Sequence, residues 1–239
     1  MFPSRAPDRP ASPPAATRRS PVPAAPPRWG LLVGSLLLTA VAMTGLALLG
    51  DRRPVFQGVD DSWTAAMHGS PDGAAAALAR GLDALGGPMG VILPIVVTGC
   101  LGIYGRWRSA LFVLTAALGT NIVVVLPLKE LVDRPRPPQP WVLVTDGSFP
   151  SGQVFTVTTL VLSCGVVLFP PLARRCWWLF SAVLIVAMMW SRTWLHAQWL
   201  SDTLAGAAAG VGVVLVQWRA FARLLEEEAV RTASGRLWD

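Results

Sequence analysis

Long apolar stretches recur along this chain of 239 residues, and they constrain its fold more than any other feature of the sequence. Hydrophobic residues make up 53% of the chain and charged residues only 14%, whereas soluble domains are about one quarter charged. An apolar helix of about 20 residues can cross the hydrocarbon core of a bilayer. Because backbone polar groups must be satisfied within lipid, the repeated stretches predict an all-α, polytopic membrane protein.

Six of these stretches are expected to cross the membrane as one helical bundle. They lie at about 29–50, 89–104, 110–128, 154–169, 177–190 and 203–218. A shorter amphipathic stretch, 74–85, is expected to lie near the membrane interface. The membrane domain then covers 29–223. Residues 1–28, rich in Pro, Ala, Ser and Arg, predict a disordered basic tail, and 224–239 predict a second tail.

An even number of spans places both termini on one side of the membrane. Thirteen of the 20 Lys and Arg residues fall on that side, and seven fall on the other, namely Arg52, Arg53, Arg80, Lys129, Arg134, Arg136 and Arg192. The positive-inside rule therefore predicts a plasma membrane protein with both termini in the cytoplasm. The formal charge of +6 does not indicate nucleic-acid binding, because the basic residues are scattered between apolar spans.

Three polar segments on the predicted outer side adjoin span ends and carry residues suited to phosphate. The segments are 129–137, 149–153 and 191–202. Arg matches phosphate oxygens with a planar fork, Lys supplies a point charge, and a helix N-terminus favours anions. Any one cation at a span end more often snorkels to the interface, but three together near hydrocarbon are costly without an anion. The candidate phosphate ligands are Lys129, Arg136, Ser151, Gly152 and Arg192, and no metal or cofactor is expected.

These segments resemble the three motifs of the type 2 phosphatidic acid phosphatase family, membrane lipid-phosphate phosphatases related to vanadium haloperoxidases. The family's motifs read K-x6-R-P, P-S-G-H and S-R-x5-H-x3-D. Lys129, Arg136 and Pro137 match the first, Pro150, Ser151 and Gly152 the second, and Ser191, Arg192 and Asp202 the third. The resemblance covers roughly residues 30–220 and implies a six-helix core with a site facing outside the cell.

The two catalytic histidine positions of the family are Gln153 and Gln198 in this chain. The resemblance implies that the first histidine protonates the leaving oxygen. The second attacks phosphorus, oriented by the residue matching Asp202. A carboxamide can neither attack phosphorus nor deliver a proton, and loss of a nucleophile can cost on the order of 10⁶ in rate. Gln still forms hydrogen bonds, so Gln198 could bridge Asp202 and a phosphate oxygen.

Two histidines, His68 and His196, are the candidates to replace the missing nucleophile. His196 precedes Gln198 by two residues, which in a helix turns it about 200° away. An interfacial role beside Trp194 and Trp199 accounts for it better. His68 lies in the first predicted outer loop and could fold over the site as a lid or an acid.

The sequence favours binding of a phosphorylated lipid head group, of the phosphatidate or polyprenyl phosphate type, with hydrolysis lost or strongly reduced. Every inferred phosphate ligand remains, while both proton-handling residues are replaced, as in a pseudoenzyme. One alternative is a lipid phosphate phosphatase or polyprenyl diphosphatase with a non-standard nucleophile, and another is a purely structural subunit. Three glycines, Gly206, Gly210 and Gly212, permit close helix packing either within the bundle or in a dimer, so the oligomeric state stays open.

Overall fold

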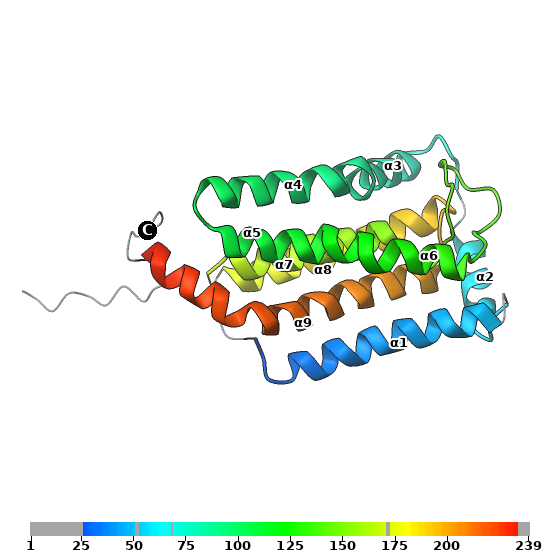
Figure 1. The fold of residues 1–239 in the computed structure, drawn as a ribbon. Helices are drawn as coiled ribbons and strands as arrows, with labels where there is room; N and C mark the ends of the chain where they lie inside the picture. Colours follow the sequence, from blue (N-terminus) through cyan, green and yellow to red (C-terminus); the bar gives the residue numbers. More distant parts are fainter. Residues whose placement is uncertain (1–25, 51–52, 68, 171–172, 234–239) are drawn as a thin grey trace, which may run out of the picture.

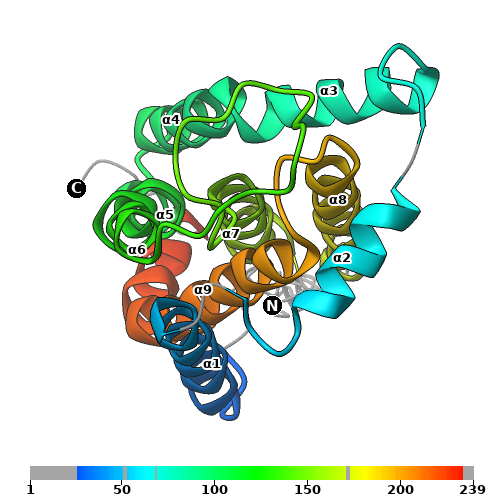
Figure 2. The ribbon, with the colours of Figure 1, turned by 90° about the vertical axis from the view of Figure 1, so that its right-hand side faces the viewer.

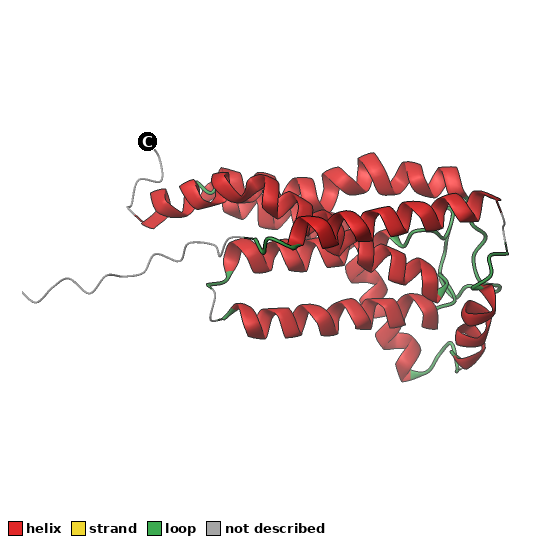
Figure 3. Ribbon diagram, turned by 90° about the horizontal axis from the view of Figure 1, so that it is seen from below, coloured by secondary structure: helices red, strands yellow, loops and turns green. Residues whose placement is uncertain are grey.

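The computed structural model describes residues 26–50, 53–67, 69–170 and 173–233, and within them the chain is helical without strands (Figures 1 and 3). Two short π-helical segments, Thr115–Gly119 and Asn121–Val125, join helix α5 (Trp107–Leu114) to helix α6 (Leu126–Val132). The helices are α1 (Gly30–Gly50), α2 (Gln57–Ala66), α3 (Ala74–Gly86), α4 (Pro88–Ile103), α5 (Trp107–Leu114), α6 (Leu126–Val132), α7 (Gly152–Leu168), α8 (Arg174–Trp194) and α9 (Leu200–Ala233).

The predicted all-α membrane fold is confirmed, but the helices differ in their capacity to span a bilayer. Four described segments are long and apolar enough, namely Gly30–Gly50, Trp107–Val132, Arg174–Trp194 and Leu200–Thr232. The consecutive helices α3 and α4 meet the same criterion together, across a bend of 46°. Helix α7 is apolar but has only 17 residues. Length and composition therefore support four spans, or five if the bent pair crosses as one.

Helix α3 lies at one edge of the bundle and packs one face against α8. Ala76 and Ala79 are fully buried, and the Ser191 hydroxyl of α8 donates a hydrogen bond of 2.6 Å to the Ala79 carbonyl. Gly87 separates α3 from α4, which begins at Pro88. Proline is well suited to the first turn of a helix, so a new helix starts at Pro88. This helix, α4, is bent by 46° from α3 and continues along the same edge of the bundle (Figure 2).

Helix α7 occupies the centre of the bundle, surrounded by the other long helices (Figure 2). It approaches α9 closely because α9 presents glycines there. An added Cβ at Gly206 would lie 2.5 Å from the Ser151 carbonyl oxygen, and one at Gly210 would lie 2.8 Å from Thr158 Cβ. Gly212 faces α1 in the same way. All three glycines therefore serve packing within the bundle.

Helix α9 continues through the predicted domain boundary at residue 224 as far as Ala233. Glu228 is buried, and its carboxylate accepts hydrogen bonds from the backbone N–H groups of Arg108 and Ser109 at 2.7 and 3.2 Å. The carboxylate thus satisfies free N–H groups in the first turn of α5. Of the two predicted tails, 1–28 and 224–239, residues 1–25 and 234–239 lie outside the described residues.

The three motif segments gather at one end of the bundle, which we call the site end. Helix α2, the loop between α6 and α7, and the turn between α8 and α9 all lie there (Figure 1). The start of α1 and the end of α9 lie at the opposite end (Figure 1). The fold therefore brings together segments that lie far apart in the sequence, while both described chain ends lie away from them.

Candidate anion-binding site

A cavity of about 570 Å³ opens at the site end, and cationic side chains line one part of it. The polar lining comes from the ends of three helices and from two connecting loops. It includes Lys129 of α6, Arg136 and Asp146 of the following loop, Gly152 and Gln153 of α7, Arg192 of α8 and Gln198 of the α8–α9 turn. Of the predicted phosphate ligands only Ser151 does not line it. We call this space the cation-lined cavity.

The carboxylate of Asp146 bridges two of the cations. Lys129 Nζ donates to Asp146 Oδ2 at 2.5 Å, and Arg136 Nη2 donates to Asp146 Oδ1 at 2.6 Å. The Lys129 and Arg136 side chains are 6% and 11% exposed, whereas that of Asp146 is 48% exposed. Burial on its own raises the pKa of Asp146, but hydrogen bonding to Lys129 and the charges of Lys129 and Arg136 outweigh it, so the pKa lies below its usual value.

Backbone carbonyls also accept hydrogen bonds from the same two cations. Lys129 Nζ donates to Gly147 O at 2.8 Å, and Arg136 Nη1 donates to Ala197 O at 2.5 Å. An added Cβ at Gly147 would lie 2.8 Å from the Lys129 carbonyl oxygen, so glycine permits the close approach of the loop to α6. The positions of both cations are thus fixed partly by backbone groups.

The third cation, Arg192, pairs with Asp83 of α3. Arg192 Nη1 donates to Asp83 Oδ1, and the arginine side chain is only 5% exposed. Arg192 Nε is buried and has no hydrogen-bond partner among the described residues. The charges of Arg136 and Arg192 both act on Lys129. Three interacting cations and the Asp146 carboxylate therefore line one cavity. Together with Asp83, which pairs with Arg192 outside the lining, these groups carry an excess of one positive charge.

Gln198 hydrogen-bonds to the second motif and forms no hydrogen bond with Asp202. The Ser151 hydroxyl donates to Gln198 Oε1 at 2.5 Å, and Gln198 Nε2 donates to Ser148 O at 3.3 Å. The same hydroxyl accepts from Val154 N at 3.3 Å and so caps α7. The expected bridge from Gln198 to Asp202 is therefore absent, because both groups of the amide are engaged elsewhere.

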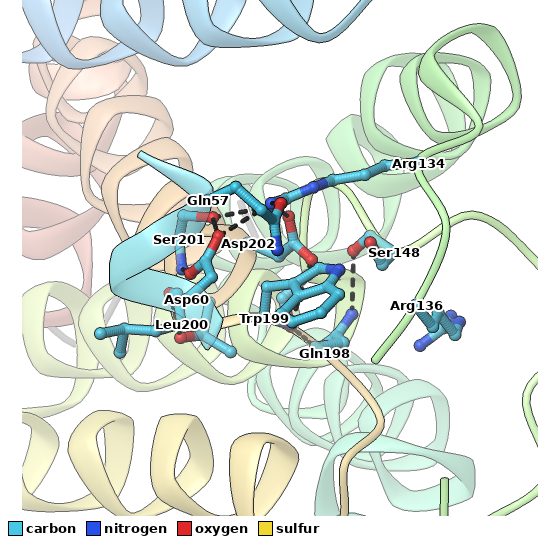
Figure 4. Close-up of polar contacts among 12 residues, drawn as sticks. Gln57, Asp60, Arg134, Arg136, Ser148, Gln198, Trp199, Leu200, Ser201 and Asp202 are labelled. Atoms are coloured by element: carbon cyan, nitrogen blue, oxygen red, sulfur yellow. Dashed lines mark hydrogen bonds and ion pairs between the residues drawn. The ribbon is translucent and has the colours of Figure 1, made fainter. Parts of the chain in front are cut away.

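Asp202 belongs instead to a buried cluster centred on Arg134 (Figure 4). Arg134 Nη1 donates to Asp202 Oδ1 at 2.5 Å, and Arg134 Nη2 donates to Asp60 Oδ2 at 2.8 Å. Gln57 and Ser201 accept two further hydrogen bonds from the guanidinium at 2.7 and 2.8 Å, while Arg134 Nε is buried without a partner among the described residues. Sequence reasoning missed this cluster. Its only signal was a pair of unassigned charges, Asp60 and Arg134, which need partners if buried.

The remaining predicted site residues have different surroundings. Gln153 lines the cavity, and its Oε1 is buried without a hydrogen-bond partner among the described residues. The His196 ring stacks on Trp141 with centroids 5.3 Å apart, and its Nε2 lies 2.9 Å from Met67 O. His196 does not line the cavity. His68 lies outside the described residues. Within the described ranges, no three His, Cys, Asp or Glu side chains could hold a metal ion.

The bundle and its cation-lined cavity define a class, the helical membrane proteins with a lipid phosphatase fold. The family model of the PAP2 superfamily matches residues 109–226, which contain all three motifs, and the chain belongs to this superfamily. The predicted resemblance to type 2 phosphatidic acid phosphatases is thereby confirmed.

A solved structure supports the fold independently. It is that of a transmembrane PAP2 type phosphatidylglycerolphosphate phosphatase from Bacillus subtilis. The two proteins share 20% sequence identity with a TM-score of 0.61, over 80% of this chain and 96% of that chain. At this identity the likeness shows a shared fold. No curated protein matches the chain.

Proposed function

We propose that the chain binds a phosphorylated lipid head group at the extracytoplasmic face of the plasma membrane, with hydrolysis lost or strongly reduced. The observation that carries the proposal is the cation-lined cavity, which keeps Lys129, Arg136 and Arg192 beside the amides Gln153 and Gln198. Cations bind phosphate oxygens through charge-assisted hydrogen bonds. The Bacillus subtilis protein is named for a lipid phosphomonoester, which supports the same ligand class here.

The apolar lining of the cavity supports a lipid over a free phosphate. It includes Val91 and Ile95 of α4, Leu118 and Ile122 of the two π-helical segments, and Leu126 of α6. Val91 and Ile122 are 53% and 61% exposed on helices that we expect to face hydrocarbon. One space thus offers cations to a head group and apolar side chains to its tail, an arrangement suited to an amphiphile.

The hydrogen bonds of Gln198 argue against hydrolysis by the family's mechanism. Its amide nitrogen is a donor without a usable lone pair, and its oxygen is occupied by the Ser151 hydroxyl. Ser151 in turn has no neighbouring base, because an amide oxygen cannot take up its proton at neutral pH. We therefore expect binding without ordinary turnover. The phosphatase fold itself favours the alternative, a lipid phosphate phosphatase or polyprenyl diphosphatase with a non-standard nucleophile.

The proposal is tested with the full chain purified in detergent. Short-chain phosphatidic acid is titrated by calorimetry, and phosphate release from phosphatidic acid and undecaprenyl pyrophosphate is followed in parallel. We expect binding by the wild type and about tenfold to 100-fold weaker binding by Lys129→Met and Arg192→Gln, since each loses a charge-assisted hydrogen bond. Arg80→Gln is the matched control, because Arg80 is an exposed cation of the site end that does not line the cavity.

Two results would count against the proposal. Absence of binding, or equal weakening by Arg80→Gln, would remove the cavity as a phosphate site. Phosphate release by the wild type at about 1–10³ s⁻¹, the range of ordinary enzymes, would establish the phosphatase alternative.

A further inference from the structure

We propose that Asp146 is an internal competitor for the phosphate ligand: its carboxylate occupies the positions on Lys129 and Arg136 that phosphate oxygens would take, and the ligand binds by displacing it. This inference rests on the proposed function, since it concerns how the same site is controlled. Its basis is the bridge itself. One carboxylate oxygen bonds Lys129 Nζ and the other bonds Arg136 Nη2, at 2.5 and 2.6 Å.

Asp146 lies where it can leave without opening the bundle. It belongs to the segment between α6 and α7, and its side chain is half exposed while those of Lys129 and Arg136 are buried. Leu143 and Thr145, just before it, are also exposed, whereas the residues from Gly147 to Ser151 are buried. Upstream, Trp141 N donates to Leu195 O at 2.9 Å. Between these two anchors Val142 and Val144 are half-buried against Leu195 and Ala197. The Asp146 backbone oxygen also accepts from Arg136 Nε at 2.8 Å, so displacement requires the exposed Asp146 side chain to turn away from the cations while the backbone stays near its place.

The cations keep much of their support when Asp146 leaves. Lys129 retains its hydrogen bond to Gly147 O, and Arg136 retains those to Gly147 O and Ala197 O, at 2.8, 3.2 and 2.5 Å. None of these involves the Asp146 carboxylate. The site is thus preformed, and displacement exchanges one anion for another on cations that already face the cavity.

The charges favour such an exchange for a phosphomonoester. Lys129 and Arg136 share one carboxylate, while Arg192 has Asp83. A phosphomonoester carries about −1.5 to −2 charges near pH 7, so it balances the two cations better than a single carboxylate does. Because the ligand must first displace Asp146, its apparent affinity is lower than its intrinsic affinity by the fraction of molecules in which the cations are free.

The first test is affinity. Short-chain phosphatidic acid is titrated into the full chain as wild type, Asp146→Asn and Glu130→Gln. We expect Asp146→Asn to bind about tenfold more tightly or better, as removal of the competitor requires. Glu130→Gln removes the same charge from an exposed position next to Lys129 and should bind within about twofold of the wild type, since surface charges contribute little.

Two further measurements complement the titrations, and the second uses the wild type alone, so it does not depend on how well Asp146→Asn folds. Inorganic phosphate should raise the thermal midpoint of Asp146→Asn more than that of the wild type, because ligand linkage stabilises the site that lacks its own anion. In the wild type, phosphatidic acid should increase amide hydrogen exchange in residues 142–146, the reverse of the protection that a ligand normally gives.

The outcomes separate the two proposals. If neither wild type nor Asp146→Asn binds, or if Lys129→Met leaves binding unchanged, the proposed function fails and this inference with it. If the wild type binds through Lys129 but Asp146→Asn binds no more tightly, or the ligand protects residues 142–146, Asp146 is not a competitor and the proposed function stands.

Discussion

Arg134 donates a 2.5 Å hydrogen bond to Asp202, and the side chains of this pair are 1% and 0% exposed. The second oxygen of Asp202 accepts from Trp199 N at 3.2 Å. The carboxylate that the family resemblance assigns to orienting a nucleophile is therefore engaged by other groups, while Gln198 bonds to Ser151. Asp202 is thus held by Arg134 and by the Trp199 backbone, and not by Gln198.

Restoring both histidines should produce only slow hydrolysis. We expect Gln153→His combined with Gln198→His to release phosphate from phosphatidic acid, because the pair supplies a nucleophile and an acid. The rate should fall well below that of ordinary enzymes, since loss of the orienting carboxylate alone can cost about 10⁴ in rate. A phosphate-release assay on wild type, both single variants and the double variant checks this. Full turnover in the double variant, or equal turnover in Gln198→His alone, would contradict it.

Removing Arg134 should destabilise the protein strongly. Arg134→Met leaves Asp60 and Asp202 buried without their cation, and breaking a buried pair in this way costs about 3–5 kcal/mol. Thermal unfolding in detergent should show a large fall in midpoint, whereas Arg80→Met at an exposed position should change it little. Asp60→Asn should partly rescue Arg134→Met, because it removes one of the stranded charges. Additive losses in the double variant would show that the two residues are uncoupled.

A methyl group at Gly206 should separate α9 from α7. The added Cβ would lie 2.5 Å from Ser151 O, and Ser151 N donates to Asp202 O at 3.0 Å across the same interface. We expect Gly206→Ala to lose about 1–3 kcal/mol of stability through overpacking, and to weaken phosphatidic acid binding. Gly99→Ala in α4, where nothing lies within 4 Å of the added Cβ, should be neutral or stabilising. Calorimetry and thermal unfolding of both variants provide the comparison.

The pH dependence of binding should follow the ligand instead of Asp146. The pKa of Asp146 is lowered in the folded protein. Its ion pairs are therefore fully present above the unfolded value of about 3.9 and are lost only as pH falls through the lower folded value. Between pH 5 and 8 the bridge is constant, while a phosphomonoester gains its second charge near about pH 6.

Titrations across this range test that expectation. Phosphatidic acid should bind more tightly as pH rises from 5 to 8, with the same midpoint in the wild type and in Asp146→Asn. A phosphodiester lipid, which has no second ionisation, should show no such change. A midpoint that moves in Asp146→Asn would show that the carboxylate titrates within the range.

The sequence by itself determined the class of fold and the residues that meet at the site. Apolar stretches of sufficient length must form helices in a bilayer, because lipid offers backbone groups no partners. The ordered motifs then indicated that Lys129, Arg136 and Arg192 share one site, and these residues line one cavity. Composition and motif spacing are local properties of the chain, and they can be read without knowing how the helices pack.

Only the tertiary structure decided which anion neutralises each cation. Asp146 bridges Lys129 and Arg136, Asp83 pairs with Arg192, and the partners of Arg134 lie 74 and 68 residues away in the sequence. An ion pair forms wherever packing brings opposite charges together in a low-dielectric interior. That choice depends on the positions of α2, α3 and the α6–α7 loop, and no local pattern in the sequence encodes it.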